Sequence, residues 1–430
     1  MLSFIHLSDI HFHNYSGDAY DIDEDLRNEL LNDISLNLKK EIPSVDGILI
    51  CGDIAFSGQD RQYEIATAFL NSICDILSLD KLRVFCVPGN HDVDQNVTRN
   101  QRSVQLFQHD LDSAGNVTQY DIALANAFRI PGDADIMCKP IEHYNAFAAQ
   151  YGCSFEERSI WEQEMRLNDD YTLGIVGINS TIISNESDHG ADNAERPMRI
   201  SHMQIPKRKD KIIYLTLCHH PPECWVDPEK NLSKKMDART VLQLYGHKHI
   251  QTIRETPTGI AVSSGATHPS RTEDDWIPRY NWITLETNKM GAKTFLSIKI
   301  YPRVLDKIEN KFEVDKSLRT GSDFVEYSFC LNEATSVDTD NQALEEIFTP
   351  IESVVLPVKS WERKFMYDFI NLPFFCRESI LKDFNLTIPT DEGKKHAELL
   401  PEFMRRAICN SCVQQLLDRI KDEKGRIDNL

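Results

Sequence analysis

Short apolar runs of strand length recur through about the first 300 residues, and each is followed by a polar or glycine-containing turn. Continuous apolar runs of this length are typical of strands that are buried on both faces, as in layered α/β folds. The pattern therefore predicts a layered α/β core in this part of the chain. The runs are Phe4–Leu7, Gly47–Ile50, Arg83–Val87, Leu173–Ile178, Ile212–Leu217, Val241–Tyr245, Ile260–Ser263, Trp282–Leu285 and Phe295–Ile300.

Two segments between the first three runs have the apolar spacing of amphipathic helices, namely Ile22–Lys40 and Tyr63–Leu77. Apolar residues at intervals of three and four are typical of a helix that covers a core with one face. Beyond residue 255 the helical spacing disappears and the apolar runs follow one another directly. We therefore expect the last strands to be added in antiparallel orientation.

An insertion interrupts this alternation at residues 96–172. It contains three amphipathic segments, Val104–Leu111, Ile122–Phe128 and Ile141–Tyr151. Because it directly follows a cluster of polar residues described below, we expect it to form a helical cap over a functional site. A second polar stretch, Ser184–Pro206, is expected to flank the same site.

A polar and acidic stretch at residues 332–345 has the composition of a linker. We predict a first domain over residues 1–331 and a small all-α domain over residues 346–430. Two apolar stripes support helices in the second domain: Trp361, Phe365, Phe369 and Ile370, then Phe403, Ala407, Ile408, Cys412, Leu416 and Ile420.

Composition narrows the class of protein. The 430 residues carry a formal net charge of −20, which gives no general attraction for duplex nucleic acid, whose binding depends on many cationic contacts. No apolar stretch approaches the roughly 18 residues of a membrane span. The first residues lack the basic start and cleavage site of a signal peptide. The 11 cysteines are odd in number and scattered, as in proteins of a reducing compartment. We expect a cytoplasmic protein.

Residues that bind metal ions follow five of the predicted strands. The carboxyl ends of strands are where sites form in α/β sheets, so we expect these residues to meet. Alternation along an extended chain would place Asp9 and His11 on the same side. The clusters are Asp9-Ile10-His11, Gly52-Asp53, Gly89-Asn90-His91-Asp92, His219 and Gly246-His247-Lys248-His249.

In this order the motifs D-x-H, GD, GNHD, H and GH-x-H resemble those of the calcineurin-like metallophosphoesterases. The resemblance covers roughly residues 1–300 and implies a layered αββα sandwich that hydrolyses phosphoesters with two divalent metal ions. In one departure, the second motif continues to Phe56 without the further acidic residue that some members carry. That residue is not a metal ligand in the family, so the expected centre is unaffected.

The resemblance also implies the ligands. One metal would be held by Asp9, His11, His249 and a bridging Asp53, and the other by Asp53, Asn90, His219 and His247. Imidazole and carboxylate ligands suit Mn²⁺, Fe or Zn²⁺, whereas a Mg²⁺ site favours oxygen. A pair of ions about 3.5–4 Å apart activates a bridging hydroxide and clamps the phosphoryl oxygens. We expect this hydroxide to attack phosphorus.

Among the other histidines, His91 is implied to lie near the leaving-group oxygen and to protonate it, so His91 and Asp53 are the expected catalytic residues. His220 is expected to face away from His219 and to play a supporting or structural part. His6 and His13 are not ligands in the family pattern. His268 is expected to be a loop residue, with substrate contact as the alternative. Possible phosphate contacts are Arg271 and Arg279.

Superfamily motifs fix the reaction better than the substrate. The stretches GDIAFSG (52–58) and HHPP (219–222) look most like those of the cyclic-nucleotide type of phosphodiesterase, so a soluble phosphodiester such as a nucleotide is the expected substrate. The first alternative is a DNA or RNA nuclease of the same fold, such as one in a bacterial defence system. The net charge of −20 counts against it. A phosphoprotein phosphatase is the second alternative. A scaffold that binds metal or a partner without catalysis is the third.

The C-terminal region poses a separate question. Residues 372–380, residues 384–386 and the last helical segment resemble the small effector-associated adaptor domains of bacterial conflict systems. Such domains pair with a like domain on another protein, which implies a protein partner or self-association through residues 346–430. The alternative is a helical appendage that packs on the first domain or forms a dimer.

Overall fold

The computed structural model describes residues 1–14, 21, 23–130, 132–156, 158–188, 195–269, 277–318 and 322–331, and in the C-terminal region residues 369, 372, 374–384, 386–387, 399, 403, 406–407 and 412–428. Contacts divide the chain into two compact units, Met1–Glu333 and Ala334–Leu430, which are described separately. Across the described residues, no helix combines the length and apolarity that a membrane span requires.

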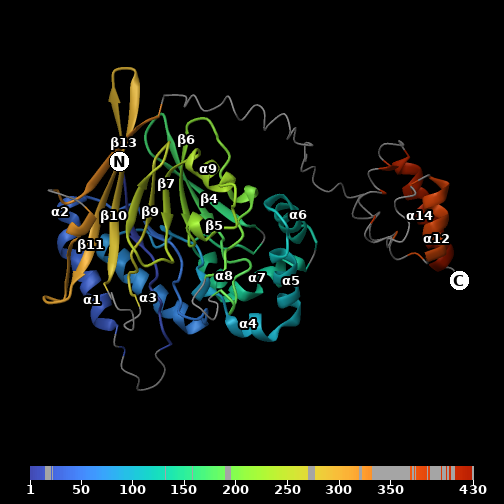
Figure 1. Cartoon of the computed structure of the whole chain (residues 1–430), viewed down its shortest axis with the longest axis horizontal. Helices are drawn as coiled ribbons and strands as arrows, with labels where there is room; N and C mark the ends of the chain where they lie inside the picture. The colour runs from blue at the N-terminus through green and yellow to red at the C-terminus, as the bar shows by residue number, and fades with distance from the viewer. Residues whose placement is uncertain are drawn as a thin grey trace. The chain divides into compact units, whose positions relative to one another are not determined.

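Two sheets form the centre of the first unit (Figure 1). In the first sheet, β1, β2 and β3 run parallel, whereas β10, β11, β12 and β13 are added in antiparallel pairs. The strand order is β12-β11-β10-β1-β2-β3, with β13 paired to β11. The strands are β1 (Leu2–Leu7), β2 (Gly47–Ile50), β3 (Val84–Cys86), β10 (Arg279–Met290), β11 (Lys293–Asp306), β12 (Lys311–Val314) and β13 (Val325–Cys330).

The second sheet has the order β4-β5-β6-β7-β9-β8. Strands β5, β6, β7 and β9 are parallel, and the edge strands β4 and β8 pair antiparallel to their neighbours. The strands are β4 (Ile160–Arg166), β5 (Thr172–Ile178), β6 (Ile212–Cys218), β7 (Thr240–Tyr245), β8 (Thr252–Glu255) and β9 (Ile260–Ser263).

The two sheets share one hydrophobic core, because residues of both belong to a single buried cluster. The same cluster includes one face of α1 (Glu24–Asp33) and of α3 (Asp60–Leu77). In a separate buried apolar cluster, α9 (Asn231–Asp237) packs against residues of β5, β6 and β9 in the second sheet. These layers confirm the predicted αββα sandwich.

Every apolar run that was predicted to be a strand forms one, but three details differ from expectation. β9 lies beyond residue 255 yet pairs parallel to β7, although its other neighbour, β8, is antiparallel to it. β4 falls within the predicted insertion, because residues 160–166 form an edge strand instead of part of a cap. The helix predicted at Ile22–Lys40 contains a π-helical turn, Ile34–Leu38, between α1 and α2 (Lys39–Glu41).

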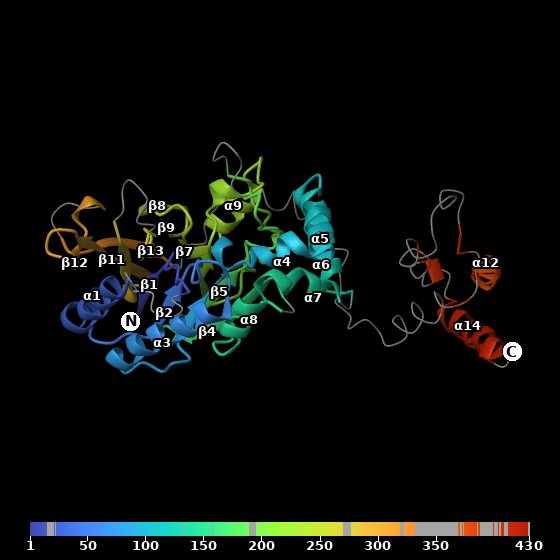
Figure 2. The same cartoon turned by 90° about the horizontal axis from the view of Figure 1, so that it is seen from below.

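The helical part of the insertion spans residues 95–149 and lies beside the sheets in two perpendicular views (Figures 1 and 2). Its first helix, α4, starts three residues after Asp92 of the GNHD motif, so the insertion is tied directly to that loop. The helices are α4 (Gln95–Asn100), α5 (Arg102–Asp112), α6 (Val117–Ala127), α7 (Asp133–Cys138) and α8 (Glu142–Ala149).

The second unit has a small apolar core of its own, formed around α12 (Phe374–Asp383) and α14 (Val413–Asp428). This core includes Phe369 from the first predicted stripe and five residues of the second, namely Phe403, Ala407, Cys412, Leu416 and Ile420. Trp361, Phe365, Ile370, Ile408 and the predicted linker at 332–345 lie outside the described residues.

A buried ion pair joins the end of α1 to the first sheet. The Arg303 guanidinium donates to Asp33 from Nε at 2.8 Å, and the Tyr280 hydroxyl donates to the same carboxylate at 2.5 Å. Arg303 also lies over the ring of Trp282, 4.5 Å from its centroid. Because Asp33 and Arg303 are only 3% and 5% exposed, each charge depends on the other for compensation.

We expect Asp33→Ala to lower the free energy of unfolding by about 3–5 kcal/mol, since it leaves the Arg303 guanidinium buried without a counter-ion. Urea unfolding followed by tryptophan fluorescence measures this change. The matched control is Glu64→Ala, which removes an ion pair whose side chains are 60% and 62% exposed and should cost about 1 kcal/mol or less. Equal effects of the two substitutions would contradict the prediction.

Candidate metal centre

Five parallel strands end around one point. β1, β2 and β3 belong to the first sheet, and β6 and β7 belong to the second. The loops that follow them carry all seven residues expected as metal ligands. Because the sheets pack face to face, side chains of both reach a common buried site.

The backbone at this site is left-handed, which the sequence did not predict. Asp9, His11 and Asp53 have φ angles of 53°, 52° and 50°, and His247 and His249 have φ angles of 71° and 55°. A residue with a side chain rarely adopts positive φ, and clusters of such residues mark functional sites. Asp9 and His11 do lie close together, but the expectation that an extended backbone would bring them there was wrong. β1 ends at Leu7, and tight left-handed turns direct the side chains.

The first group of expected ligands converges around Asp9 and Asp53. His249 Nε2 lies 3.3 Å from Asp9 Oδ1, and His11 Nε2 lies 3.3 Å from Asp53 Oδ2. The donor atoms of Asp9, His11 and His249 all lie within 4.8 Å of one another. Ligands bound at about 2.0–2.2 Å to one ion are roughly 3–3.5 Å apart, so these contacts suit a shared cation.

The second group converges around Asn90. His219 Nε2 and His247 Nδ1 each lie 3.0 Å from Asn90 Oδ1. His219 Nε2 is also 3.3 Å from Asp53 Oδ2, the same oxygen that contacts His11. One carboxylate oxygen of Asp53 thus lies between a histidine of the first group and a histidine of the second. This arrangement fits a carboxylate that bridges two cations.

The electrostatics of the site also suit cations. Burial raises the pKa of the Asp9 carboxyl, but the contacts with His249 and the attraction from His219 together outweigh it and bring the pKa to about 2. Asp53 is likewise ionised, because His219 and His91 outweigh its burial and hold its pKa well below the usual range. Burial lowers the pKa of His219, yet Asp53 raises it to about 9. The buried carboxylates therefore hold positive charge beside them, which divalent ions would supply.

A second ring of contacts fixes these side chains. The Cys51 carbonyl lies 2.8 Å from His219 Nδ1, and the His268 carbonyl lies 3.3 Å from His11 Nδ1. Each contact leaves Nε2 of the ring as the nitrogen that faces the site. A metal-binding histidine is commonly oriented by such a contact through its other ring nitrogen.

Asp92 holds the loop that carries Asp53. Its carboxylate accepts hydrogen bonds from the main-chain N–H groups of Ile54, Ala55 and Gly89 at 2.8–3.1 Å, and from the Tyr63 hydroxyl at 2.9 Å. Burial, followed by repulsion from Asp53, raises the pKa of Asp92 to about 6. Asp92 therefore positions the loop of the second motif.

His91 is held at both ends. Its main-chain N–H donates to Asp53 Oδ1 at 2.8 Å, and its Nδ1 lies 2.9 Å from the carbonyl oxygen of Phe56. A carbonyl only accepts, so Nδ1 carries a proton and Nε2 is left to meet a substrate. Phe56 thus holds His91 through its main-chain carbonyl.

The other histidines singled out from the sequence lie close to this site. His220 does not face away: its ring lies 4.4 Å from that of His247, and its Nδ1 is 2.8 Å from the Ser180 hydroxyl. His268 lies in the loop after β9, as expected, but it is buried and its carbonyl contacts His11. Burial lowers the pKa of His6 to about 3, which makes it a neutral core residue. His13 stacks on the ring of Phe56 at 4.1 Å.

Neither arginine proposed from the sequence is seen to face the site. Arg279 Nε donates to Asp315 at 2.8 Å, so its guanidinium forms an ion pair with that carboxylate. Arg271 lies outside the described residues.

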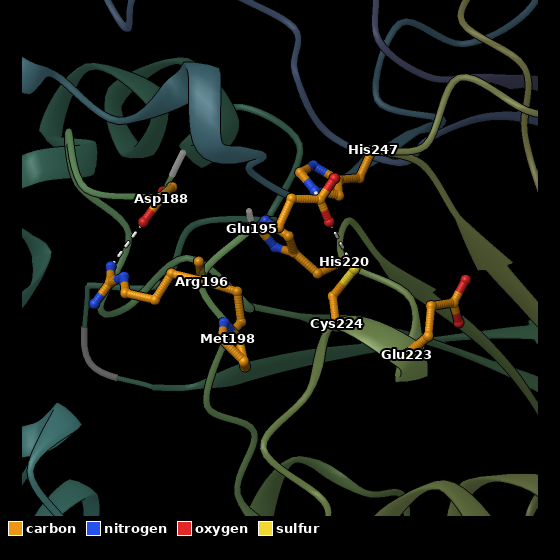
Figure 3. Close-up of a pocket in the computed structure, with 9 residues that line it drawn as sticks. Asp188, Glu195, Arg196, Met198, His220, Glu223, Cys224 and His247 are labelled. Carbon is orange, nitrogen blue, oxygen red and sulfur yellow. Dashed lines mark hydrogen bonds and ion pairs between the residues drawn. The ribbon is translucent and has the colours of Figure 1, made fainter. Parts of the chain in front are cut away.

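One neighbour of the centre was missed. Figure 3 shows Glu195 beside His247 and Cys224, in a small pocket that His220 also lines. Its Oε2 is 3.6 Å from His247 Nε2, and it forms an ion pair with Lys248. Glu195 lies in the polar stretch Ser184–Pro206 that was expected to flank the site, but no local pattern distinguishes it from other exposed acids.

Comparisons with known proteins point to the same family as the motifs. A family model described as calcineurin-like phosphoesterase matches residues 2–251. An uncharacterised metallophosphoesterase-like protein of Bacillus subtilis, YydB, is 26% identical over 252 residues, which cover 57% of this chain and 48% of that protein. The chain therefore spans about half the length of this curated relative.

Similarity to solved structures is low. Vps29 of Entamoeba histolytica in complex with Zn²⁺ gives a TM-score of 0.31 at 10% identity, covering 76% of this chain and 99% of that one. The sulfate thiohydrolase SoxB of Thermus thermophilus gives a TM-score of 0.31 at 11% identity, covering 66% and 54%.

Proposed function

The chain belongs to the calcineurin-like phosphoesterase family, and we propose that its first unit is a metal-dependent hydrolase of phosphodiesters, with a soluble nucleotide as substrate. The observation that carries the proposal is the single Asp53 oxygen placed 3.3 Å from both His11 and His219. A buried carboxylate between two groups of histidines suits a pair of divalent cations better than a core contact.

The residues present fit two such ions, which we assign as Mn²⁺, Fe or Zn²⁺ because imidazole and carboxylate ligands suit these metals. When bound, the pair would lower the pKa of a water molecule and neutralise the phosphoryl oxygens. The first ion would be held by Asp9, His11, His249 and Asp53, and the second by Asp53, Asn90, His219 and His247.

His91 would act on the leaving group. Hydrolysis forms a P–O bond to the oxygen of the attacking water and breaks the P–O bond to the departing alcohol. The departing oxygen takes the Nε2 proton of a His91 imidazolium, which leaves a neutral ring protonated on Nδ1, and the proton that the water loses restores the imidazolium through solvent. Because His91 is fixed through Phe56 and Asp53, this transfer needs no rearrangement of its ring.

The alternatives rest on fewer observations. The −20 net charge disfavours a nuclease, which grips nucleic acid with cationic side chains. Near the site, Arg196 and Arg279 are both paired with carboxylates, so their charge is already compensated. A scaffold without activity would not need a histidine held as His91 is.

The second unit is proposed to bind a protein partner or a second copy of the chain. It has its own buried core, which is the property of an independent module.

Loss of the bridging carboxylate tests the enzyme claim. With Mn²⁺, the protein should hydrolyse bis(p-nitrophenyl) phosphate, and Asp53→Asn should abolish turnover because one ligand to both ions is weakened. Release of p-nitrophenolate and metal content by mass spectrometry measure the two effects. Glu64→Gln, on the exposed face of α3, is the control. Turnover that survives Asp53→Asn would defeat the proposed centre.

Leaving-group dependence tests His91. We expect His91→Ala to slow a dinucleoside monophosphate about 10²–10⁴-fold, since an alkoxide must be protonated as it departs. Bis(p-nitrophenyl) phosphate should lose much less, because p-nitrophenolate is a stable anion. Steady-state rates of both substrates give the ratio. His109→Ala, a 78% exposed histidine of α5, is the control. Equal losses on both substrates would assign His91 to orientation only.

Truncation tests the second unit. A chain that ends at residue 345 should keep its turnover of the model diester if the unit is a binding module, because the first unit has its own core. Enzyme assays and size-exclusion chromatography measure activity and assembly. Insoluble or unfolded truncated protein would indicate a packed appendage instead.

A further inference from the structure

A pocket of about 480 Å³ opens next to His91. It lies between the loop after β2, which contributes Phe56 and Gln59, and helix α4, which contributes Gln95, Asn96 and Arg99. Pockets that bind small molecules have volumes of roughly 300–1,000 Å³. The pocket is therefore large enough for a nucleoside.

The position of His91 in the lining indicates which part of a substrate this pocket would bind. Its lining includes His91 but none of the seven proposed metal ligands. In the proposed reaction His91 gives its proton to the departing oxygen, so the space beyond it is where the departing group lies. The pocket is thus placed to bind the leaving group and not the phosphoryl group.

Phe56 gives the pocket an aromatic wall. It is 42% exposed, although its ring stacks on His13 with 4.1 Å between centroids. The contact with His13 limits the motion of the ring while leaving much of it accessible. An accessible aromatic ring in a polar pocket is a stacking surface for a nucleobase.

The remaining wall is mostly polar, and Asp94 and Arg99 contribute one charge of each sign. The amides of Gln59, Gln95 and Asn96 both donate and accept hydrogen bonds, as the edge of a heterocyclic base requires. Arg99 Nη2 donates to Gln95 Oε1 at 2.7 Å. Within the part of the chain that the structure describes, no carboxylate is paired with Arg99, so its other donors are available to acceptor atoms of a base.

We propose that this pocket binds a nucleoside leaving group, with the base against Phe56 and its polar edge at Gln95 and Arg99. The inference rests on the proposed phosphodiesterase function and assigns the substrate class at the leaving side. It makes Phe56 and Arg99 specificity-determining residues that act on KM.

Two substrates that differ only in the leaving group test this. One is a dinucleoside monophosphate, and the other is the methyl ester of the same nucleoside monophosphate, which releases methanol. Phe56→Leu keeps an apolar side chain of similar bulk but removes the aromatic face. We expect it to lower kcat/KM for the dinucleoside about tenfold more than kcat/KM for the methyl ester, through KM, from the typical strength of base stacking.

Arg99→Ala should show the same selective loss, and Leu106→Ala, a 51% exposed apolar residue of α5, should change neither rate. Equal losses on both substrates would mean that Phe56 acts through His91, which overturns the inference. Unchanged rates in both pocket variants overturn it too, while the proposed function stands. If the wild-type protein with Mn²⁺ hydrolyses neither ester nor bis(p-nitrophenyl) phosphate, the proposed function fails and the inference with it.

Discussion

The arrangement of the whole site depends on the carboxylate of Asp53. It is 2% exposed, and a buried anion is tolerated only when nearby groups compensate it. One oxygen contacts a histidine from each sheet, and the other accepts the main-chain N–H of His91. The space around it is equally constrained, since a Cβ atom at Gly89 would lie 2.1 Å from Asp53 Oδ1. The loops around this group are therefore built to its shape and charge.

The sequence predicted the core of the fold because strands buried on both faces leave continuous apolar runs. It missed the edge strands for the same reason: β8 is largely exposed, so Thr252–Glu255 has no apolar run to recognise. The expected ligands meet, but the reasoning about Asp9 and His11 assumed an extended chain where the backbone is left-handed. Glu195 and the orientation of His220 depend on the path of loops, which residue spacing does not encode.

The chemistry and the selectivity of the site come from different parts of the chain. The ligands follow strand ends that the layered fold brings together. The neighbours of His91 come from the loop after β2 and from α4, which starts three residues after Asp92. If the proposed pocket binds the leaving group, a change of side chain at Phe56 or in α4 would leave the proposed ligands in place while altering what they act upon.

The division of the ligands between the sheets has a consequence for assembly. Asp9, His11, Asp53 and Asn90 come from the first sheet, and the three remaining histidines come from the second. Ions held by both sets of proposed ligands would link the two sheets through loops that are far apart in the chain. Folding and metal uptake would then be linked equilibria, with free metal concentration setting part of the stability of the sandwich.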